Sequence, residues 1–252
     1  MGRQDWGYLL VVVGVLAVDS TSTYHGGASG LDMRPRYIAP VRFDDLATIR
    51  GSYHVWSPKL RYFGCLVPKA GCTSWLEYIY HMHLPADLAK TYERGLAKYH
   101  SISHMEHGLH FRAMDSRQNT TAIEAVLNDP SYFKFVVARH PWHRLLSAYR
   151  SKYEGMCKAD PVCFEKHFGV PANGQDDITF HDFVRLLSKM PPRSLDPHFR
   201  PATLLCELTR IAYNYTGDLT NTSDNDYISA RVGFPVPFSV FTEEKRMQYN
   251  EE

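Results

Sequence analysis

The stretch "FGCLVPKAGCTSW", residues 63–75, places a lysine and two hydroxyl side chains among small residues directly after an apolar run. Backbone N–H groups at the start of a helix bind anions, and small residues let the anion approach closely. Lysine comes first here, whereas a Walker A loop ends in lysine and a magnesium-binding hydroxyl. The pattern therefore predicts an anion site without the ATP–magnesium arrangement. Its candidate residues are Pro68, Lys69, Ala70, Gly71, Cys72, Thr73 and Ser74.

A second cluster of basic residues lies in "RHPWHRLLSAYRSK", residues 139–152. Arginine makes bidentate contacts to phosphate, so Arg139 is the first candidate for a phosphate ligand. The Ser147 hydroxyl is placed to reach the same group. Arg150 and Lys152 are also consistent with an ordinary solvated helix face. The candidates for anion binding in this segment are Arg139, His140, Pro141, Arg144 and Ser147.

Both segments follow short apolar runs that are typical of buried strands. The expected strands are 62–67 and 133–138, with a third within 210–218. Helices are expected after each loop, with Ser74 and Glu77 as a capping box for the first, and also at 121–127 and 180–189. Alternation of strands and helices predicts an α/β fold around a mainly parallel sheet. Ligands bind at the carboxyl ends of such strands, where both loops fall.

The two segments resemble a known family. "PKAGCTSW" and "RHPWHRLLSAYRSKY" are similar to the nucleotide signatures of the Golgi carbohydrate sulfotransferases, and "HFRPATLLC" is similar to that family's H-W-x-P…L-C segment. The resemblance implies a three-layer fold like that of the P-loop NTPases. It implies that the first loop holds the 5′-phosphosulfate of 3′-phosphoadenylyl sulfate (PAPS), through Lys69, Gly71, Cys72, Thr73 and Ser74. Arg139 and Ser147 would then hold the 3′-phosphate.

The activity that this resemblance implies is transfer of a sulfuryl group from PAPS to a glycan hydroxyl, without a metal ion. Lys69 would stabilise charge on the leaving group, and a general base would take the hydroxyl proton. His198 is the preferred base because it matches the family histidine. His104 and Glu106 are alternatives, and so is a structural role for His198 in a turn beside Pro197.

The sequence also departs from the family pattern. Thr209 stands where the family has a second cysteine, and "YNYTGDLT" lacks both acidic residues of the corresponding family segment. These changes put a disulfide of that region and the acceptor site in question. They motivate an alternative hypothesis, in which the chain is a degenerate, secreted member that binds anionic glycans or nucleotide without transfer.

Other patterns favour simpler interpretations. In "HMEHGLH", His104, His107 and His110 are three apart and drift around a helix, so no metal site is predicted. Trp56 and Trp142 could stack on sugar rings, but aromatic residues more often lie in the core. The net charge of +1 provides no general field for nucleic acid, so no nucleic-acid partner is expected.

The N-terminal segment predicts entry into the secretory pathway. An apolar run, 6–18, follows Arg3 and fits a signal peptide or a short Golgi-type anchor. The expected organisation is a leader or anchor at 1–20, a stem at 21–55 and a sulfotransferase domain at 56–252. The location would be the Golgi lumen as a type II membrane protein, or outside the cell after cleavage.

Glycosylation sequons and cysteines agree with that location. The sequons begin at Asn119, Asn214 and Asn221. Cys157 and Cys163 flank a short proline-containing loop that a disulfide could close in an oxidising compartment. The chain has five cysteines, so at least one stays unpaired within it, and Cys72 is the expected one.

Overall fold

The computed structural model describes residues 40–42, 54–86, 109–111, 120–158, 160–168 and 178–250. These residues divide into two compact units. The sheet unit contains the described residues up to Ala138 and from Cys206 onward, and the helical unit contains those from Arg139 to Leu205. Each unit is described by itself.

The sheet unit is built on five strands in the order β3-β1-β2-β4-β5. The strands β2, β4 and β5 are parallel, while β1 runs antiparallel to both β2 and β3. The mainly parallel sheet expected from the sequence is therefore confirmed, with β1 as the reversed strand. The strand bounds are β1 His54–Ser57, β2 Tyr62–Leu66, β3 His110–Phe111, β4 Phe133–Ala138 and β5 Tyr215–Asp218.

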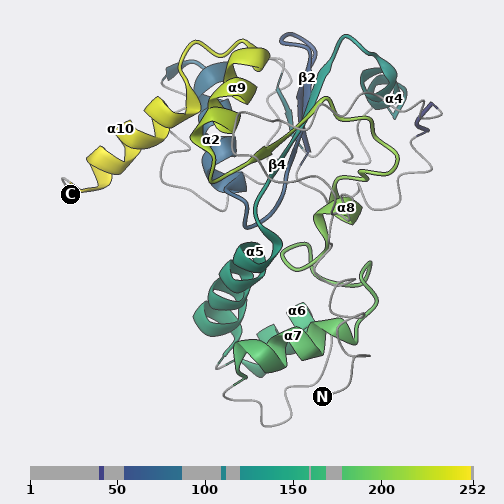
Figure 1. Cartoon of the computed structure of the whole chain (residues 1–252), viewed down its shortest axis with the longest axis vertical. Helices are drawn as coiled ribbons and strands as arrows, with labels where there is room; N and C mark the ends of the chain where they lie inside the picture. The colour runs from purple at the N-terminus through teal and green to yellow at the C-terminus, as the bar shows by residue number, and fades with distance from the viewer. Residues whose placement is uncertain are drawn as a thin grey trace, which may run out of the picture. The chain divides into compact units, whose positions relative to one another are not determined.

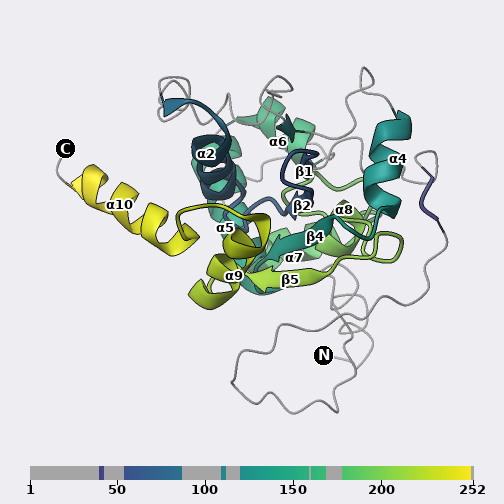
Figure 2. The same ribbon diagram turned by 90° about the horizontal axis from the view of Figure 1, so that it is seen from above.

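Helices cover both faces of this sheet. Figures 1 and 2 show α2 and α9 on one side of the strands and α4 on the other. This is the layered arrangement that the resemblance implied. The helices of the unit are α2 Cys72–His83, α4 Thr120–Asn128, α9 Thr222–Val232 and α10 Phe238–Asn250.

The main core of the sheet unit lies between the strands and helices α2, α9 and α10. All five residues of β2 are buried, because apolar groups cover both of its faces. Trp75 of α2 is completely buried and stacks on Phe238 of α10, with ring centroids 4.4 Å apart. The helical face predicted from Trp75 and Ile79 is thus a core face, and both residues are buried.

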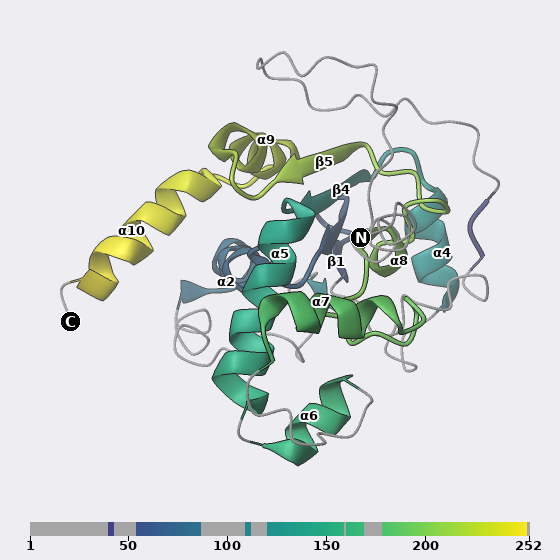
Figure 3. The ribbon, with the colours of Figure 1, turned by 60° about the horizontal axis from the view of Figure 1, so that its bottom comes forward.

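The helical unit packs a second, aromatic core. Figure 3 shows its helices α5, α6 and α7. Leu145, Tyr149 and Tyr153 share the buried face that their spacing predicted. The hydroxyl of Tyr149 donates to the Ile178 carbonyl at 2.6 Å, and the Ile178 N–H donates to the Tyr153 hydroxyl at 2.7 Å. The elements are α5 Pro141–Ala148, the π-helix η4 Tyr149–Cys157, α6 Pro161–Phe168, α7 Phe180–Ser188 and α8 Ala202–Leu205.

Of two predicted helix starts, one is confirmed and the other is wrong. The helix α7 begins as expected, with the Thr179 hydroxyl accepting the N–H of Asp182 at 3.2 Å. The capping box at Ser74 is wrong, because α2 already begins at Cys72 and its cap is Gly71. Gly71 adopts φ 68°, a left-handed conformation that glycine reaches without steric cost.

Both predictions about cysteine are confirmed, and the structure adds a second disulfide. Cys157 and Cys163 form a disulfide, and Cys72 is free and buried. Cys206 pairs with Cys65 of β2 across 141 residues of sequence. The sequence put a disulfide of the 206–209 region in question, because Thr209 replaces a family cysteine. Cys206 does form a disulfide, but its partner lies in a distant strand.

The expected N-terminal leader and stem lie mostly outside the described residues. Within the part of the chain that is described, no helix combines the length and apolar character needed to cross a bilayer. Of the sequon asparagines, Asn214 and Asn221 are exposed, and Asn119 lies outside the described residues.

Candidate functional site

The first candidate loop connects β2 to α2 inside the sheet unit. The N–H of Ala70 donates to the Val67 carbonyl at 3.0 Å, which closes a tight turn, and the N–H of Trp75 donates to the Gly71 carbonyl at 3.0 Å as the first helical bond. The first turn of α2 therefore presents the N–H groups of residues 72–74, which have no earlier helical carbonyl to bind. The cap residue, Gly71, has no side chain that could bind these N–H groups. The loop has the backbone of an anion site.

Two residues of this loop adopt left-handed backbone conformations. Lys69 has φ 66° and Gly71 has φ 68°. A residue with a Cβ pays about 1 kcal/mol or more for this region, so the loop stores strain at the lysine. Alternation of such conformations turns successive N–H groups inward, which is the geometry of anion-binding nests. Lys69 is half-buried, so part of it is reachable from solvent. Its backbone conformation belongs to the tight turn between Val67 and Ala70.

Cys72 contributes to this loop through its backbone rather than its thiol. Its side chain belongs to the main core of the sheet unit. Burial raises the pKa of the Cys72 thiol, and hydrogen bonds from the Thr73 side chain and the Lys69 backbone offset part of that rise. The thiol is therefore neutral at pH 7 and is a poor nucleophile. The hydroxyl residues differ in exposure, since Thr73 is half-buried and Ser74 is exposed.

The second candidate loop follows β4 and opens the helical unit. Arg139 comes directly after the last residue of β4, and its buried Nε has no hydrogen-bond partner among the residues that the structure describes. A buried guanidinium nitrogen without a partner is costly, and an anionic ligand would satisfy it. Pro141 occupies the first turn of α5, as expected from its missing N–H. This half of the predicted site thus offers an unsatisfied donor.

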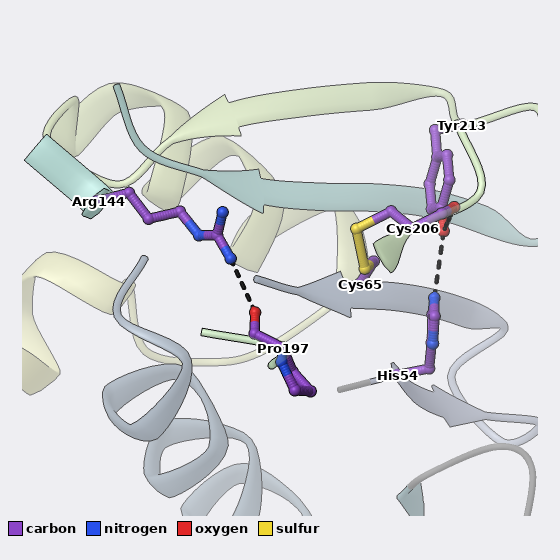
Figure 4. Close-up of a disulfide and its surroundings, with 6 residues drawn as sticks. All are labelled: His54, Cys65, Arg144, Pro197, Cys206 and Tyr213. Atoms are coloured by element: carbon purple, nitrogen blue, oxygen red, sulfur yellow. Dashed lines mark hydrogen bonds between the residues drawn. A yellow bond between two sulfur atoms is a disulfide. The ribbon is translucent and has the colours of Figure 1, made fainter. Parts of the chain in front are cut away.

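The remaining residues of that loop differ in their surroundings. His140 and His143 are both exposed, with ring centroids 5.1 Å apart. Ser147 is half-buried near the end of α5. Arg144 is only 8% exposed, and its guanidinium donates to the Pro197 carbonyl at 2.9 Å (Figure 4). Arg144 therefore anchors the turn that carries His198.

His198 lies in that turn, beside a carboxylate. Its Nδ1 is 2.6 Å from Oδ1 of Asp196, and its backbone N–H donates to the same oxygen at 2.8 Å. With the proton on Nδ1, the lone pair is on Nε2, which is the arrangement of an oriented general base. The side chain is 20% exposed, so solvent or a substrate can reach it. The turn itself is closed by the N–H groups of Phe199 and Arg200, which both donate to the Asp196 carbonyl at 2.9 Å.

The strands place the starts of both loops at one edge of the sheet. In the parallel ladder of β2 and β4, Leu66 pairs with Val137, so each strand ends within two residues of its neighbour. Ala138 in turn pairs with Asp218 at the end of β5. The expectation that both loops leave the carboxyl ends of strands in a mainly parallel sheet is confirmed, and the structure adds that β2 and β4 are neighbours. Lys69 belongs to the sheet unit, and Arg139 begins the helical unit.

Several sequence-based candidates receive a different role or none. Trp56 is buried in β1, so it belongs to the core, whereas Trp142 is 39% exposed. His104 and Glu106, the alternative bases, lie outside the described residues, as does His107 of the histidine cluster. Among the residues that the structure describes, no cluster of His, Cys, Asp and Glu side chains could hold a metal ion.

Sequence reasoning missed three contributors to these loops. Asp196 was overlooked although it stands two residues before His198, a spacing that allows a side chain to bond the backbone ahead of it. Leu219 and Asn225 had no visible signal. Leu219 contacts Ala138 and Gly71, and Asn225 contacts Trp75, all of which are far away in the sequence.

Taken one by one, the first loop offers backbone N–H donors, the second loop offers an arginine, and the turn at residue 198 offers an imidazole oriented by Asp196. Comparison with known proteins gives the class: the model of the sulfotransferase family matches residues 54–251, and the chain belongs to that family. This confirms the resemblance seen in the two loop segments.

The similar curated proteins are carbohydrate sulfotransferases. Human carbohydrate sulfotransferase 14 is 30% identical over 167 residues, which are 64% of this chain and 41% of that protein. Human carbohydrate sulfotransferase 9 is 29% identical over 188 residues, covering 68% and 39%, respectively. Carbohydrate sulfotransferase 10 of Xenopus laevis is 27% identical over 195 residues, covering 70% and 52%. The chain thus spans about half or less of these relatives' length, and no solved structure matches it significantly.

Proposed function

We propose that this protein transfers a sulfuryl group from PAPS to a hydroxyl group of a glycan. The observation that carries the proposal is the pair of loops that leave adjacent parallel strands, β2 and β4, at one sheet edge. Membership of the sulfotransferase family and the names of the similar proteins support it. The donor and the acceptor class belong to this proposal.

The donor nucleotide would be held at both of its anionic ends. The first-turn N–H groups of residues 72–74, together with Lys69 and the hydroxyls of Thr73 and Ser74, would bind the 5′-phosphosulfate. Arg139 and Ser147 would bind the 3′-phosphate, and the buried Nε of Arg139 supports that role because an anion would satisfy it. His140 and Pro141 would shape the start of α5 around this phosphate. Arg144 would act indirectly, through the Pro197 carbonyl.

The chemical step would be an in-line displacement at sulfur. The acceptor hydroxyl oxygen forms a bond to sulfur, and the bond from sulfur to the phosphate oxygen breaks. Lys69 stabilises the negative charge that grows on the departing phosphate oxygen. His198 takes the hydroxyl proton on Nε2, while Asp196 stabilises the resulting imidazolium. The residues named here supply the charge stabilisation and the proton transfer of this step.

We also propose that the protein works in an oxidising compartment of the secretory pathway. Two disulfides join its four paired cysteines, and such bonds persist in oxidising compartments. The exposed sequon asparagines Asn214 and Asn221 fit the same environment. The oxygen of the Asn214 side chain accepts the N–H of Lys134 at 2.7 Å, which still leaves its amide nitrogen able to carry a glycan. The Golgi lumen would supply both PAPS and glycan acceptors.

Two measurements on the full chain test the proposed function. Calorimetric titration with adenosine 3′,5′-bisphosphate should give saturable 1:1 binding. Labelled sulfate should pass from PAPS to at least one member of a panel of desulfated glycans. Binding without transfer to any glycan would favour the alternative of a degenerate, glycan- or nucleotide-binding member. Absence of both binding and transfer would refute the proposal.

A further inference from the structure

A third loop leaves the same edge of the sheet, after β5, and one of its residues contacts the bases of both candidate anion loops. The N–H of Leu219 donates to the carbonyl of Ala138 at 2.8 Å, and Ala138 immediately precedes Arg139. The Leu219 side chain lies against Gly71, so that a Cβ added to Gly71 would overlap Leu219 Cδ1. Leu219 therefore links the end of β4 to the cap of α2.

Asn225, at the start of α9, holds this third loop in place. It is only 2% exposed, and its amide nitrogen lies within hydrogen-bond distance of three loop carbonyls, those of Asn221 at 2.7 Å, Leu219 at 2.9 Å and Asp218 at 3.4 Å. Its amide oxygen accepts the indole N–H of Trp75 at 3.3 Å. A single buried side chain thus ties the loop after β5 to helix α2.

The loop also closes on itself. Both the N–H and the hydroxyl of Thr220 donate to Oδ1 of Asp218 at 2.8 Å. The N–H of Asp218 donates to Oδ2 of Asp224 at 2.9 Å, and the other oxygen of Asp224 accepts the Tyr215 hydroxyl at 2.8 Å. These bonds make the third loop a rigid support, because few of its backbone groups are free to change partners.

We propose that Leu219 and Asn225 are positioning residues for the donor nucleotide, and that they act through the conformation of the loop from Lys69 to Ser74. Leu219 packs on the helix cap at Gly71, and Asn225 fixes both Leu219 and the neighbouring Trp75. Neither residue is assigned a contact with the nucleotide. The consequence for binding rests on the proposed function, whereas the consequence for the loop conformation does not.

The test uses the full chain and matched substitutions. Leu219→Ala removes the contact with Gly71, and Leu60→Ala is its control, because both leucines are partly buried against the same core and Leu60 lies before β2 rather than after it. Asn225→Asp keeps an acceptor for Trp75 but turns the donor to the loop carbonyls into another acceptor. The measurements are amide hydrogen exchange of residues 69–74 without ligand, the midpoint of thermal unfolding, and the affinity for adenosine 3′,5′-bisphosphate.

Both Leu219→Ala and Asn225→Asp should speed amide exchange at residues 69–74 and weaken nucleotide affinity by about tenfold or more. Leu60→Ala should lower the midpoint of thermal unfolding by a comparable amount. It should leave both the amide exchange of residues 69–74 and the nucleotide affinity unchanged. Gly71→Ala should be less harmful to affinity in the Leu219→Ala background than in the native chain, since the clash is relieved. If Asn225→Asp does not fold, Leu219→Ala and the Gly71 pair still provide the test.

The two proposals can fail separately. Unchanged amide exchange at residues 69–74 in Leu219→Ala would overturn the positioning inference, whatever the nucleotide result. Unchanged nucleotide affinity in that variant, with binding by the native chain, would overturn it as well. Failure of the native chain to bind nucleotide would count against the proposed function, while faster exchange in Leu219→Ala would still support the structural role of the third loop.

Discussion

Nδ1 of His198 lies 2.6 Å from Oδ1 of Asp196, and the backbone N–H of His198 donates to the same oxygen at 2.8 Å. One carboxylate therefore orients the imidazole ring and shapes the turn that carries it. This is the orientation that the proposed role of His198 as general base requires.

His198→Gln should lower kcat for sulfate transfer by about 100-fold or more, with little change in KM for PAPS, because the general base is lost. Asp196→Asn should lower kcat by about tenfold, since an asparagine oxygen still accepts the backbone N–H but stabilises the imidazolium less. Asp182→Asn is the matched control, as Asp182 lies 3.7 Å from the exposed His181. If all three variants kept the kcat of the native chain, His198 would be excluded as the base.

Lys69→Ala should abolish measurable transfer, a loss of about 1,000-fold or more, because charge on the departing phosphate oxygen would lose its stabilisation. The folded structure should persist, since alanine bears the same backbone cost as lysine at φ 66°. The midpoint of thermal unfolding checks this. Lys59→Ala, an exposed lysine at the opposite end of β2, should keep native activity. Native turnover in Lys69→Ala would contradict the mechanism.

Arg139→Lys should weaken binding of adenosine 3′,5′-bisphosphate by about tenfold, because lysine cannot form the bidentate contact to phosphate. Adenosine 5′-phosphate lacks the 3′-phosphate, so its affinity should hardly change in the variant. Calorimetric titration of both ligands measures the difference. Arg150→Lys, at an exposed position of η4, serves as the control. Equal losses for the two ligands would show that Arg139 does not read the 3′-phosphate.

His54 should make folding stability sensitive to acid. Burial lowers the pKa of His54 to about 3, whereas an unfolded histidine titrates near 6.5. The unfolded chain therefore binds the extra proton between these values, and the free energy of unfolding falls by about 1.4 kcal/mol per pH unit below pH 6.5. His54→Gln should remove this part of the pH dependence in urea denaturation, and His143→Gln, at an exposed site, should not. An unchanged slope in His54→Gln would refute the assignment.

The two disulfides should differ in their effect on stability. Cys65 and Cys206 are separated by 141 residues, and Cys157 and Cys163 by 6. Loop-closure entropy predicts that replacing Cys65 and Cys206 with alanine lowers the free energy of unfolding by about 5 kcal/mol. Replacing Cys157 and Cys163 should lower it by about 2 kcal/mol. Urea denaturation of the two double variants compares them directly. A larger loss for the short loop would show that native-state contacts outweigh chain entropy.

Local patterns were enough to predict several of the elements around the candidate site. The buried strands, the proline at the start of α5 and the hydroxyl cap of α7 depend on neighbouring residues, so the sequence alone indicates them. The same holds for the positions of Lys69 and Arg139, since each follows a strand in the chain. Parallel strands then bring their carboxyl ends to one edge by topology.

The capping box at Ser74 shows where local patterns are insufficient. Its residue types are correct for a cap, but the cap of α2 is Gly71, three residues earlier. Leu219 covers one side of Gly71, and the Cys72 side chain belongs to the core. Burial of the first helical turn against distant residues outweighs the small free energy of a local cap.

The sequence by itself determined the α/β alternation, the positions of the two candidate anion-binding segments and the family, because these depend on residue type and spacing along the chain. Only the tertiary structure decided that Cys206 pairs with Cys65, that Arg144 is directed to Pro197 and that Leu219 lies on Gly71. Each of these contacts joins residues that are more than 50 positions apart in the sequence. The direction of each side chain is set by the packing around it. Spacing along the chain carries little information about such contacts, since many partners are chemically equivalent until the fold brings one of them close.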